Sequence, residues 1–373
     1  MILTHPDKKA RITAELLKNR LLEEIILDPG LADNDKLPSL RTITRRYNIN
    51  HITLMRALDL LVKKGALFTE EKKGIYIRSI EKCRDAHIKN PIIAALLPHS
   101  DYNNGYYFDT VAGIIEQKTR QAGMRLIIQN LSWAASDISP YLDDFLSFYR
   151  AVSIITRVPQ GYSDTSYFTR ALLRGVTLVF IDSDVPEICA PAILVNNRKG
   201  GLLAARHLIK KKHRRIAFLR DSREETSGRT QIENDRFLGF RDALTEAGMN
   251  FYPEMDIMPV RPLSDFSCRD VEEHLKRHKL TGIFAYNDDN ALLLIEYLSK
   301  RGIRIPDDIS IIGFDNNSSG HRQLSSIDPG KEHMAEEAAR LALARKPAKK
   351  KEIIILEPRI IIRSSVKTLE ENH

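Results

Sequence analysis

The sequence predicts a small N-terminal α+β domain followed by a larger α/β domain, which has two lobes built on parallel sheets. Three observations lead to this fold class. The chain has 373 residues, which is too many for one ordinary domain. Residues 1–79 combine helical hydrophobic spacing with two short alternating runs. From residue 91 to residue 373, apolar runs of strand length alternate with amphipathic helices. Residues 80–90 between them are polar and without clear periodicity, so we expect a linker there.

The first domain opens with an amphipathic helix over residues 10–27, which the turn-forming sequence Asp28-Pro29-Gly30 ends. A short second helix begins near Ser39, whose side chain can accept a hydrogen bond from the first free backbone N–H groups. A turn at residues 47–50 follows. Two helices joined by such a turn are typical of a helix-turn-helix.

The third helix begins near residue 50, and its spacing predicts that Ile52, Leu54 and Leu58 face the core. Two alternating runs, residues 66–69 and 75–78, come next and flank a charged tip that contains glycine. This pattern predicts a β-hairpin, which makes the domain a winged helix-turn-helix.

The positive charge of the chain is concentrated in this first domain. The whole sequence has a formal net charge of +8. Residues 1–89 hold 18 Lys and Arg against 12 Asp and Glu, whereas the remainder holds 39 against 37. Within residues 36–64 there are seven basic residues and a single acid, Asp59. Such a balance is typical of a module that binds nucleic acid phosphates.

The amino-acid composition further limits the classes of protein to which the chain can belong. The chain is 43% hydrophobic and 28% charged, which allows a sizeable core. Its three cysteines, Cys83, Cys189 and Cys268, are isolated, which fits a reducing compartment. The N-terminal residues lack a signal-peptide pattern, and no apolar run approaches the roughly 18 residues of a membrane span. We therefore expect a cytoplasmic protein with no membrane partner.

Polar side chains at the start of the third helix are candidates for reading DNA. Asn50, His51 and Thr53 are its first exposed side chains, and Arg56 follows one turn later. Asn and His can read base edges, and Arg can read guanine or bind phosphate. The backbone N–H groups after Ser39 can face a phosphate. The alternative is that the arginines of these helices are only solvated surface charges.

Residues 10–79 resemble the winged-helix domain of the GntR family of bacterial transcription regulators. The resemblance rests on L-P-S-x-R at Leu37–Arg41, on the turn and third helix at residues 49–61, and on the wing strand at residues 73–77. In that family the Arg of L-P-S-x-R and the first turn of the recognition helix contact DNA, and the wing glycine approaches the minor groove. The resemblance implies operator double-stranded DNA as the partner, with candidate contacts at Ser39, Arg41, Asn50, His51, Thr53, Arg56, Lys73 and Gly74.

The second domain alternates strands and helices in a regular way. We expect strands at residues 92–97, 125–129, 152–156, 176–181, 216–219, 282–285 and 309–314, and helices at residues 111–123, 200–210, 236–247 and 290–301. Regular β-α-β alternation predicts parallel sheets covered by helices. The number of strands favours two such sheets, which form two lobes.

Ligands in such folds lie at the carboxyl ends of strands. The polar residues just after the predicted strands include Arg157, Asp182, Asn287 and Asp315. Carboxylates and amides bind hydroxyl groups, Arg donates in a planar fork, and rings such as Tyr106 and Tyr107 can cover an apolar sugar face. Alternatively, Asp182 and Asp315 cap helices or turns, the tyrosines belong to the core, and Arg236 is a surface charge. The first interpretation predicts a small sugar or polyol as the effector.

Residues 91–367 resemble the effector domain of the LacI family, which shares its fold with periplasmic sugar-binding proteins. The matching segments are residues 179–182, 200–209, 213–219, 236–240, 284–288 and 305–315. The resemblance implies that the effector ligands are Asp182, Arg236, Asn287 and Asp315, and that Tyr106 and Tyr107 stand where the family has an aromatic pair. A GntR-type reader joined to a LacI-type sensor is the arrangement of arabinose repressor-like regulators.

The sequence departs from both families at identifiable positions. His51 stands where the GntR family usually has Arg, and Met55 stands where it often has Arg. Residues 326–329 replace the stretch of the LacI family that usually carries a ligand-binding Gln. The operator sequence and the effector therefore cannot be taken from either family.

Other functional classes are less compatible with the sequence. It contains no phosphate-binding loop, no nucleophile elbow and no metal-type His or Cys spacing, so we expect no catalysis and no cofactor. An α/β sugar-phosphate enzyme would leave the basic helix-turn-helix unexplained, and a transport binding protein would need an export signal. We therefore expect a ligand-responsive transcription regulator that represses carbohydrate-utilisation genes. A nucleoside or purine effector, or an activator in place of a repressor, remains an alternative. We expect a homodimer and an operator with inverted half-sites.

Overall fold

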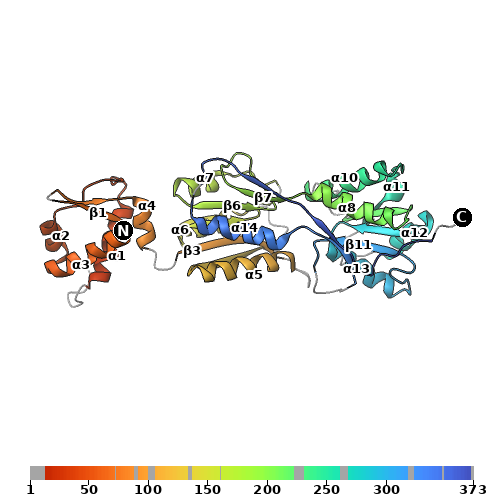
Figure 1. Cartoon of the computed structure of the whole chain (residues 1–373), viewed down its shortest axis with the longest axis horizontal. Coiled ribbons are helices and arrows are strands. Elements are labelled where there is room, and N and C mark those ends of the chain that lie inside the picture. The colour runs from red at the N-terminus through yellow and green to blue at the C-terminus, as the bar shows by residue number, and fades with distance from the viewer. Residues whose placement is uncertain are drawn as a thin grey trace. The chain divides into compact units, whose positions relative to one another are not determined.

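The computed structural model describes residues 13–71, 73–87, 91–99, 106–132, 137–159, 161–221, 231–260, 268–317, 323–346 and 348–370. The chain divides into two compact units, Met1–Pro91 and Ile92–His373, and each is described by itself (Figure 1). Within the described part of the chain, no helix is long and apolar enough to cross a membrane.

The first unit is a winged helix-turn-helix, as predicted. Its elements are α1 (Ala14–Leu27), α2 (Leu40–Tyr47), α3 (His51–Lys63), β1 (Leu67–Glu70), β2 (Gly74–Ile77) and α4 (Ile80–His87). Strands β1 and β2 pair antiparallel and form the wing. One apolar core joins the helices to the wing, and it includes Leu17 of α1, Leu54 and Leu61 of α3 and Ile77 of β2. The first helix begins at Ala14, after the described and non-helical Thr13, and residues 10–12 of the predicted helix lie outside the described residues.

Residues 80–87 are not the linker that the sequence predicted. They form helix α4, which packs against α1 and buries Cys83 and Ala86 in the core of the first unit. The Cys83 thiol donates to the carbonyl of Ala66 at 3.6 Å, and burial raises the pKa of this thiol to about 11. The helix therefore completes the first unit, while residues 88–90 lie outside the described residues.

The second unit contains two six-stranded sheets, which confirms the two predicted lobes. The first has the order β13-β7-β6-β5-β3-β4 and the second β14-β12-β11-β10-β8-β9. Neighbouring strands are parallel throughout, except that β14 runs antiparallel to β12 at the edge of the second sheet. The strands are β3 (Ile92–His99), β4 (Arg125–Ser132), β5 (Ser153–Thr156), β6 (Thr177–Ile181), β7 (Ala192–Val195), β8 (Ile216–Asp221), β9 (Ile257–Val260), β10 (Gly282–Ala285), β11 (Ser310–Phe314), β12 (Ser325–Asp328), β13 (Ile353–Leu356) and β14 (Arg359–Ile361).

Helices cover both faces of each sheet. They are α5 (Tyr106–Gln121), α6 (Ser139–Ser147), α7 (Ser166–Leu173), α8 (Asn197–Lys210), α10 (Gln231–Glu246), α11 (Pro253–Asp256), α12 (Cys268–His278), α13 (Asp288–Ser299) and α14 (Lys331–Ala344). In β8, Ile216 and Phe218 enter the core beneath α8 and α10, whereas Ala217 and Leu219 enter the core beneath α12 and α13. Burial on both faces explains why such strands are continuous apolar runs in the sequence.

The polypeptide passes between the two lobes three times, after β7, after β12 and after β13 (Figure 1). The passing segments are tied to one another: the Asn196 amide donates to the Glu357 carboxylate at 3.0 Å. At another passage the buried Asp328 carboxylate pairs with Arg359 at 2.9 Å. Three short segments therefore connect the lobes, and such segments are where hinge motion between lobes is taken up.

Candidate functional site

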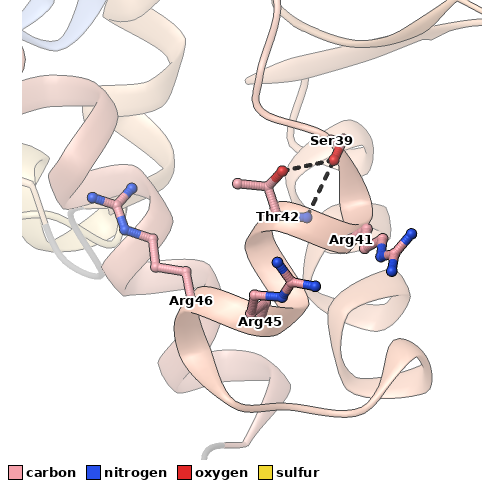
Figure 2. A pocket seen from close by; sticks show the side chains of 5 residues that line it. All are labelled: Ser39, Arg41, Thr42, Arg45 and Arg46. Atoms are coloured by element: carbon pink, nitrogen blue, oxygen red, sulfur yellow. Dashed lines mark hydrogen bonds between the residues drawn. The ribbon is translucent and has the colours of Figure 1, made fainter.

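The start of helix α2 presents a cluster of basic side chains. Ser39 caps the helix, and its hydroxyl accepts from the Thr42 backbone N–H at 3.2 Å, as the sequence predicted. Arg41 and Arg45 are exposed and extend away from the helix, and a pocket of about 380 Å³ is lined by Ser39, Arg41, Thr42, Arg45 and Arg46 (Figure 2). Arg46 pairs with Glu24 of α1 at 3.1 Å. A helix N-terminus beside exposed guanidinium groups suits a phosphate or a base edge.

The start of α3 places the predicted reading residues together. Asn50 is the N-cap of this helix, and its Oδ1 accepts from the Thr53 backbone N–H at 2.8 Å. The cap leaves the Nδ2 group of this exposed side chain as a donor. His51 and Arg56 are exposed, and Thr53 is half-buried. The first turn of α3 therefore offers donors and acceptors to a partner.

The expectation that Ile52 belongs to the core is wrong. Leu54 and Leu58 are buried as predicted, but Ile52 is 63% exposed. The sequence of α3 carries apolar residues around most of the helix, and the packing of α1 against α3 decides which of them are buried.

The wing tip holds the two remaining predicted DNA contacts. Lys73 is exposed and pairs with Glu70 at 3.3 Å, which holds its ammonium group at the tip of the hairpin. Gly74 has a φ of +134°, and a Cβ there would lie 2.8 Å from Cε of Lys36. The backbone conformation favours glycine at this position, whereas the flexible Lys36 side chain could move away from an added Cβ.

In the second unit, Arg236 of α10 is the centre of a buried polar network. Its guanidinium donates to Oδ1 of Asn197 at 2.9 Å, to the carbonyl of Tyr286 at 2.6 Å and to Oδ1 of Asp315 at 3.2 Å. The guanidinium also lies 3.5 Å from the centroid of the Phe314 ring. Arg236 is only 7% exposed, so the alternative of a surface charge is excluded.

Asp182 lies at the end of β6 and faces Arg157, at the end of β5, across 4.0 Å. Both side chains are about one-tenth exposed. Burial raises the pKa of Asp182, which the charges of Arg157 and Arg236 oppose. Arg236 belongs to the second lobe, so its influence on Asp182 brings groups from both lobes to one place. Sequence reasoning placed Arg157 at a strand end but gave it no role.

Tyr107 of α5 faces the same group of charges. Burial, followed by the carboxylates of Asp182 and Asp315, raises the pKa of this phenol well above its usual range. Its hydroxyl donates to the sulfur of Met334 at 3.8 Å. Tyr106 begins the same helix, but its side chain lies outside the described residues. The structure therefore brings together four of the predicted effector residues: Tyr107, Asp182, Arg236 and Asp315.

The backbone at two of these positions is strained. Asp182 has a φ of +49° and Asp315 a φ of +106°, and each follows the last residue of its strand. Non-glycine residues rarely adopt such values, and those that do are concentrated at functional sites. Both residues lie at the carboxyl ends of parallel strands, which is where ligands bind in such folds.

Lys331, at the start of α14, binds the backbone beside the Asp315 carboxylate. Its ammonium group donates to the carbonyls of Asp315 and Asn316 at 2.9 and 2.8 Å, and to Oδ1 of Asn317 at 3.2 Å. Burial raises the pKa of Asp315 to about 6, although Arg236 and Lys331 both oppose the shift. The role of Lys331 could not be recognised from the sequence, because a lysine in a helix gives no signal of burial.

The Asn287 side chain caps a helix next to the polar cluster around Arg236. It caps α13, and its Oδ1 accepts from the backbone and side-chain amides of Asn290 at 2.9 and 2.7 Å. The structure therefore gives Asn287 a capping role, beside the residue whose carbonyl binds Arg236. Its neighbour Asp288 is buried and accepts from the Ser326 hydroxyl at 2.7 Å, so the stretch that departs from the LacI pattern supports the site.

Asp289 should make the stability of the folded chain depend on pH. Burial, and then the charge of Asp315, raises the pKa of Asp289 to about 7. Between about pH 4 and pH 7 the Asp289 carboxyl is therefore protonated in the folded protein, whereas in the unfolded chain, with a carboxyl pKa of about 3.9, it has lost its proton. This contribution to stability is complete below pH 4 and is lost as the pH rises through about 7.

Between pH 6 and pH 8 we expect the parent to lose about 1 kcal/mol of unfolding free energy relative to the Asp289→Asn variant. The variant keeps every other titrating group, so the difference isolates Asp289. Urea unfolding of both proteins at pH 6, 7 and 8 measures it. If the two pH profiles run parallel, Asp289 does not carry a proton in the folded state.

The arrangement offers a ligand two carboxylates, two guanidinium groups and a phenol within one buried polar cluster. Vicinal hydroxyl groups can donate to carboxylates and accept from guanidinium groups, so the cluster suits a polyhydroxylated molecule. Among the described residues there is no group of His, Cys, Asp and Glu arranged to hold a metal ion.

Comparison with known proteins gives matches over both units. The family described as "Bacterial regulatory proteins, gntR family" matches residues 14–77, and a "Periplasmic binding protein-like domain" matches residues 205–366. An arabinose metabolism transcriptional repressor of Geobacillus stearothermophilus is 26% identical over 95% of this chain and 97% of its own length. The match therefore runs through both units.

Solved structures share the fold of the second unit. A LacI family transcriptional regulator from Enterococcus faecium with bound ribose superposes with a TM-score of 0.62 at 24% identity, over 75% of this chain and all of that one. A periplasmic binding protein/LacI transcriptional regulator from Alkaliphilus metalliredigens, complexed with D-xylulofuranose, gives 0.60 at 22% identity with the same coverage.

Proposed function

We propose that this chain, which joins a GntR-type helix-turn-helix domain to a LacI-type effector domain of the periplasmic-binding-protein fold, is a ligand-responsive repressor of carbohydrate-utilisation genes. One observation carries the proposal: Asp182, Arg236 and Asp315 come from strands and helices of both lobes and influence one another within one buried cluster. The same chain carries the helix-turn-helix of the first unit, so a ligand bound at this cluster could control DNA binding. The sugar ligands of the similar structures support a sugar or polyol as the effector.

The mechanism follows from the connection of the lobes. A ligand that pairs with groups of both lobes binds a closed arrangement more tightly than an open one, so it shifts the population toward closure. The three passing segments are the positions where such motion is taken up. We propose that two copies form a cytoplasmic homodimer, and that closure changes how two DNA-reading heads engage inverted half-sites. Regulation, not catalysis, is the proposed activity.

For DNA, we expect Arg41→Ala to weaken operator binding by about 1–3 kcal/mol, because we assign the exposed guanidinium beside the Ser39 cap to a base edge. Fluorescence anisotropy with a duplex selected from a random library measures the change. Arg206→Ala in α8 is the matched control, since it removes the same charge from an exposed ion pair of the second unit. Unchanged affinity of the Arg41 variant would remove this residue from the interface.

For the effector, we expect thermal unfolding to shift upward with one class of ligand among pentoses, hexoses, uronic acids and nucleosides, since a ligand that binds the folded state stabilises it. Asp315→Asn is close in shape and can still accept a hydrogen bond from Arg236, but it removes the negative charge that strengthens this bond and that a ligand hydroxyl would donate to. It should lose most of the ligand shift, and Arg41→Ala should keep it. If only nucleosides raise the unfolding temperature, the effector is a nucleoside and not a sugar. If Asp315→Asn responds as the parent does, the sensor site lies elsewhere.

A further inference from the structure

Helix α3 exposes two large apolar side chains in its first two turns. Ile52 is 63% exposed and Met55 is 42% exposed, whereas Leu54 and Leu58 of the same helix are almost completely buried. Single exposed apolar residues are ordinary on protein surfaces. Two that lie three residues apart share one helical face and form a small apolar surface.

This surface lies among polar and basic groups. Arg56 is exposed next to Met55 and one turn after Ile52, and His51 is exposed at the start of the helix. Residues 36–64 hold seven basic residues and one acid, so a polyanion is the partner that their charge favours. The surface must therefore match a partner that carries negative charge and also presents apolar groups.

The major groove of DNA presents such a combination. Phosphates border the groove, and the 5-methyl group of thymine is the one apolar feature that distinguishes a base edge within it. The first turns of a recognition helix are the part that contacts base edges. Ile52 and Met55 are at those turns, and neither can make the hydrogen bonds by which guanine or adenine is read.

We propose that Ile52 and Met55 are specificity-determining residues that read the 5-methyl groups of thymines in the operator. The inference rests on the proposed operator binding and adds the chemistry of recognition at two positions. His51 and Arg56, on the same helix, remain available for hydrogen bonds to base edges or phosphates. The operator then combines thymines facing the apolar pair with polar base edges beside them.

The experiment uses the full chain and duplexes selected by it from a random library. In the tightest duplex each thymine is replaced in turn by deoxyuridine, which removes only the methyl group. We expect about fourfold weaker binding at each contacted thymine, as the burial of one methyl group predicts. Ile52→Ala and Met55→Ala should each abolish the uracil effect at one thymine and leave it at the other.

Leu27→Ala is the matched control, because Leu27 is 68% exposed and belongs to α1 of the same unit. This variant should keep the full uracil effect at both positions. A library from which no duplex is enriched overturns the proposed operator binding and this inference with it. An enriched duplex whose affinity uracil does not change, or an Ile52→Ala variant that keeps every uracil effect, overturns this inference alone.

Discussion

Replacing Glu233 by alanine is expected to destabilise the α/β unit by about 3–5 kcal/mol, because the change leaves a buried guanidinium without its counter-charge. Arg220 lies at the carboxyl end of β8 and Glu233 in the first turn of α10, and Nε and Oε1 of the pair are 3.3 Å apart. The two residues are 4% and 1% exposed. Calorimetric unfolding of the full chain measures the loss, because it can separate the transitions of the two units.

The control for this prediction is an exposed pair of the same kind. Glu246→Ala breaks the ion pair between Glu246 and Arg206. Both of these side chains are about half exposed, so the change should alter the free energy of unfolding by less than about 1 kcal/mol. The double variant Arg220→Met and Glu233→Leu removes both charges together and should lie much closer to the parent than either single change. A Glu233→Ala protein as stable as the parent would mean that water reaches Arg220.

Gly239→Ala should also have a large effect, of about 3 kcal/mol on stability together with loss of the ligand response. A Cβ at Gly239 would lie 1.9 Å from the carbonyl oxygen of Arg198, and one at Gly201 would lie 1.9 Å from that of Arg236. Helices α8 and α10 therefore cross backbone against backbone, and a methyl group between them must push them apart. Since α10 carries Arg236, separation moves the centre of the polar cluster.

Gly113→Ala separates this steric effect from the general effect of alanine. Gly113 lies within α5, is exposed, and has nothing within 4 Å of an added Cβ. This change should stabilise the chain by about 0.5–1 kcal/mol, since alanine loses less backbone entropy in a helix. Urea unfolding and the thermal shift with ligand compare the two variants. A Gly239→Ala protein with normal stability and normal ligand response would show that the two helices can move without consequence.

Much of the candidate site could be predicted because its residues follow buried strands. Asp182 and Asp315 each come directly after a run of apolar residues, and parallel strands bring such positions to one edge of a sheet. The roles of Lys331 and Asp288 could not be predicted in the same way. Their roles depend on which helices pack beside the strand ends, and no local pattern records that packing.

The sequence by itself determined the Ser39 and Asn50 caps, the hairpin wing and the strands buried on both faces, because these are local consequences of side-chain chemistry. Only the tertiary structure decided which apolar and polar residues are covered. Residues 80–87 read as a polar linker, yet α4 packs on α1, and Ile52 read as core, yet α1 leaves it exposed. The reason is physical: helical periodicity sets which side chains share a face, and the partner element determines whether that face meets protein or solvent.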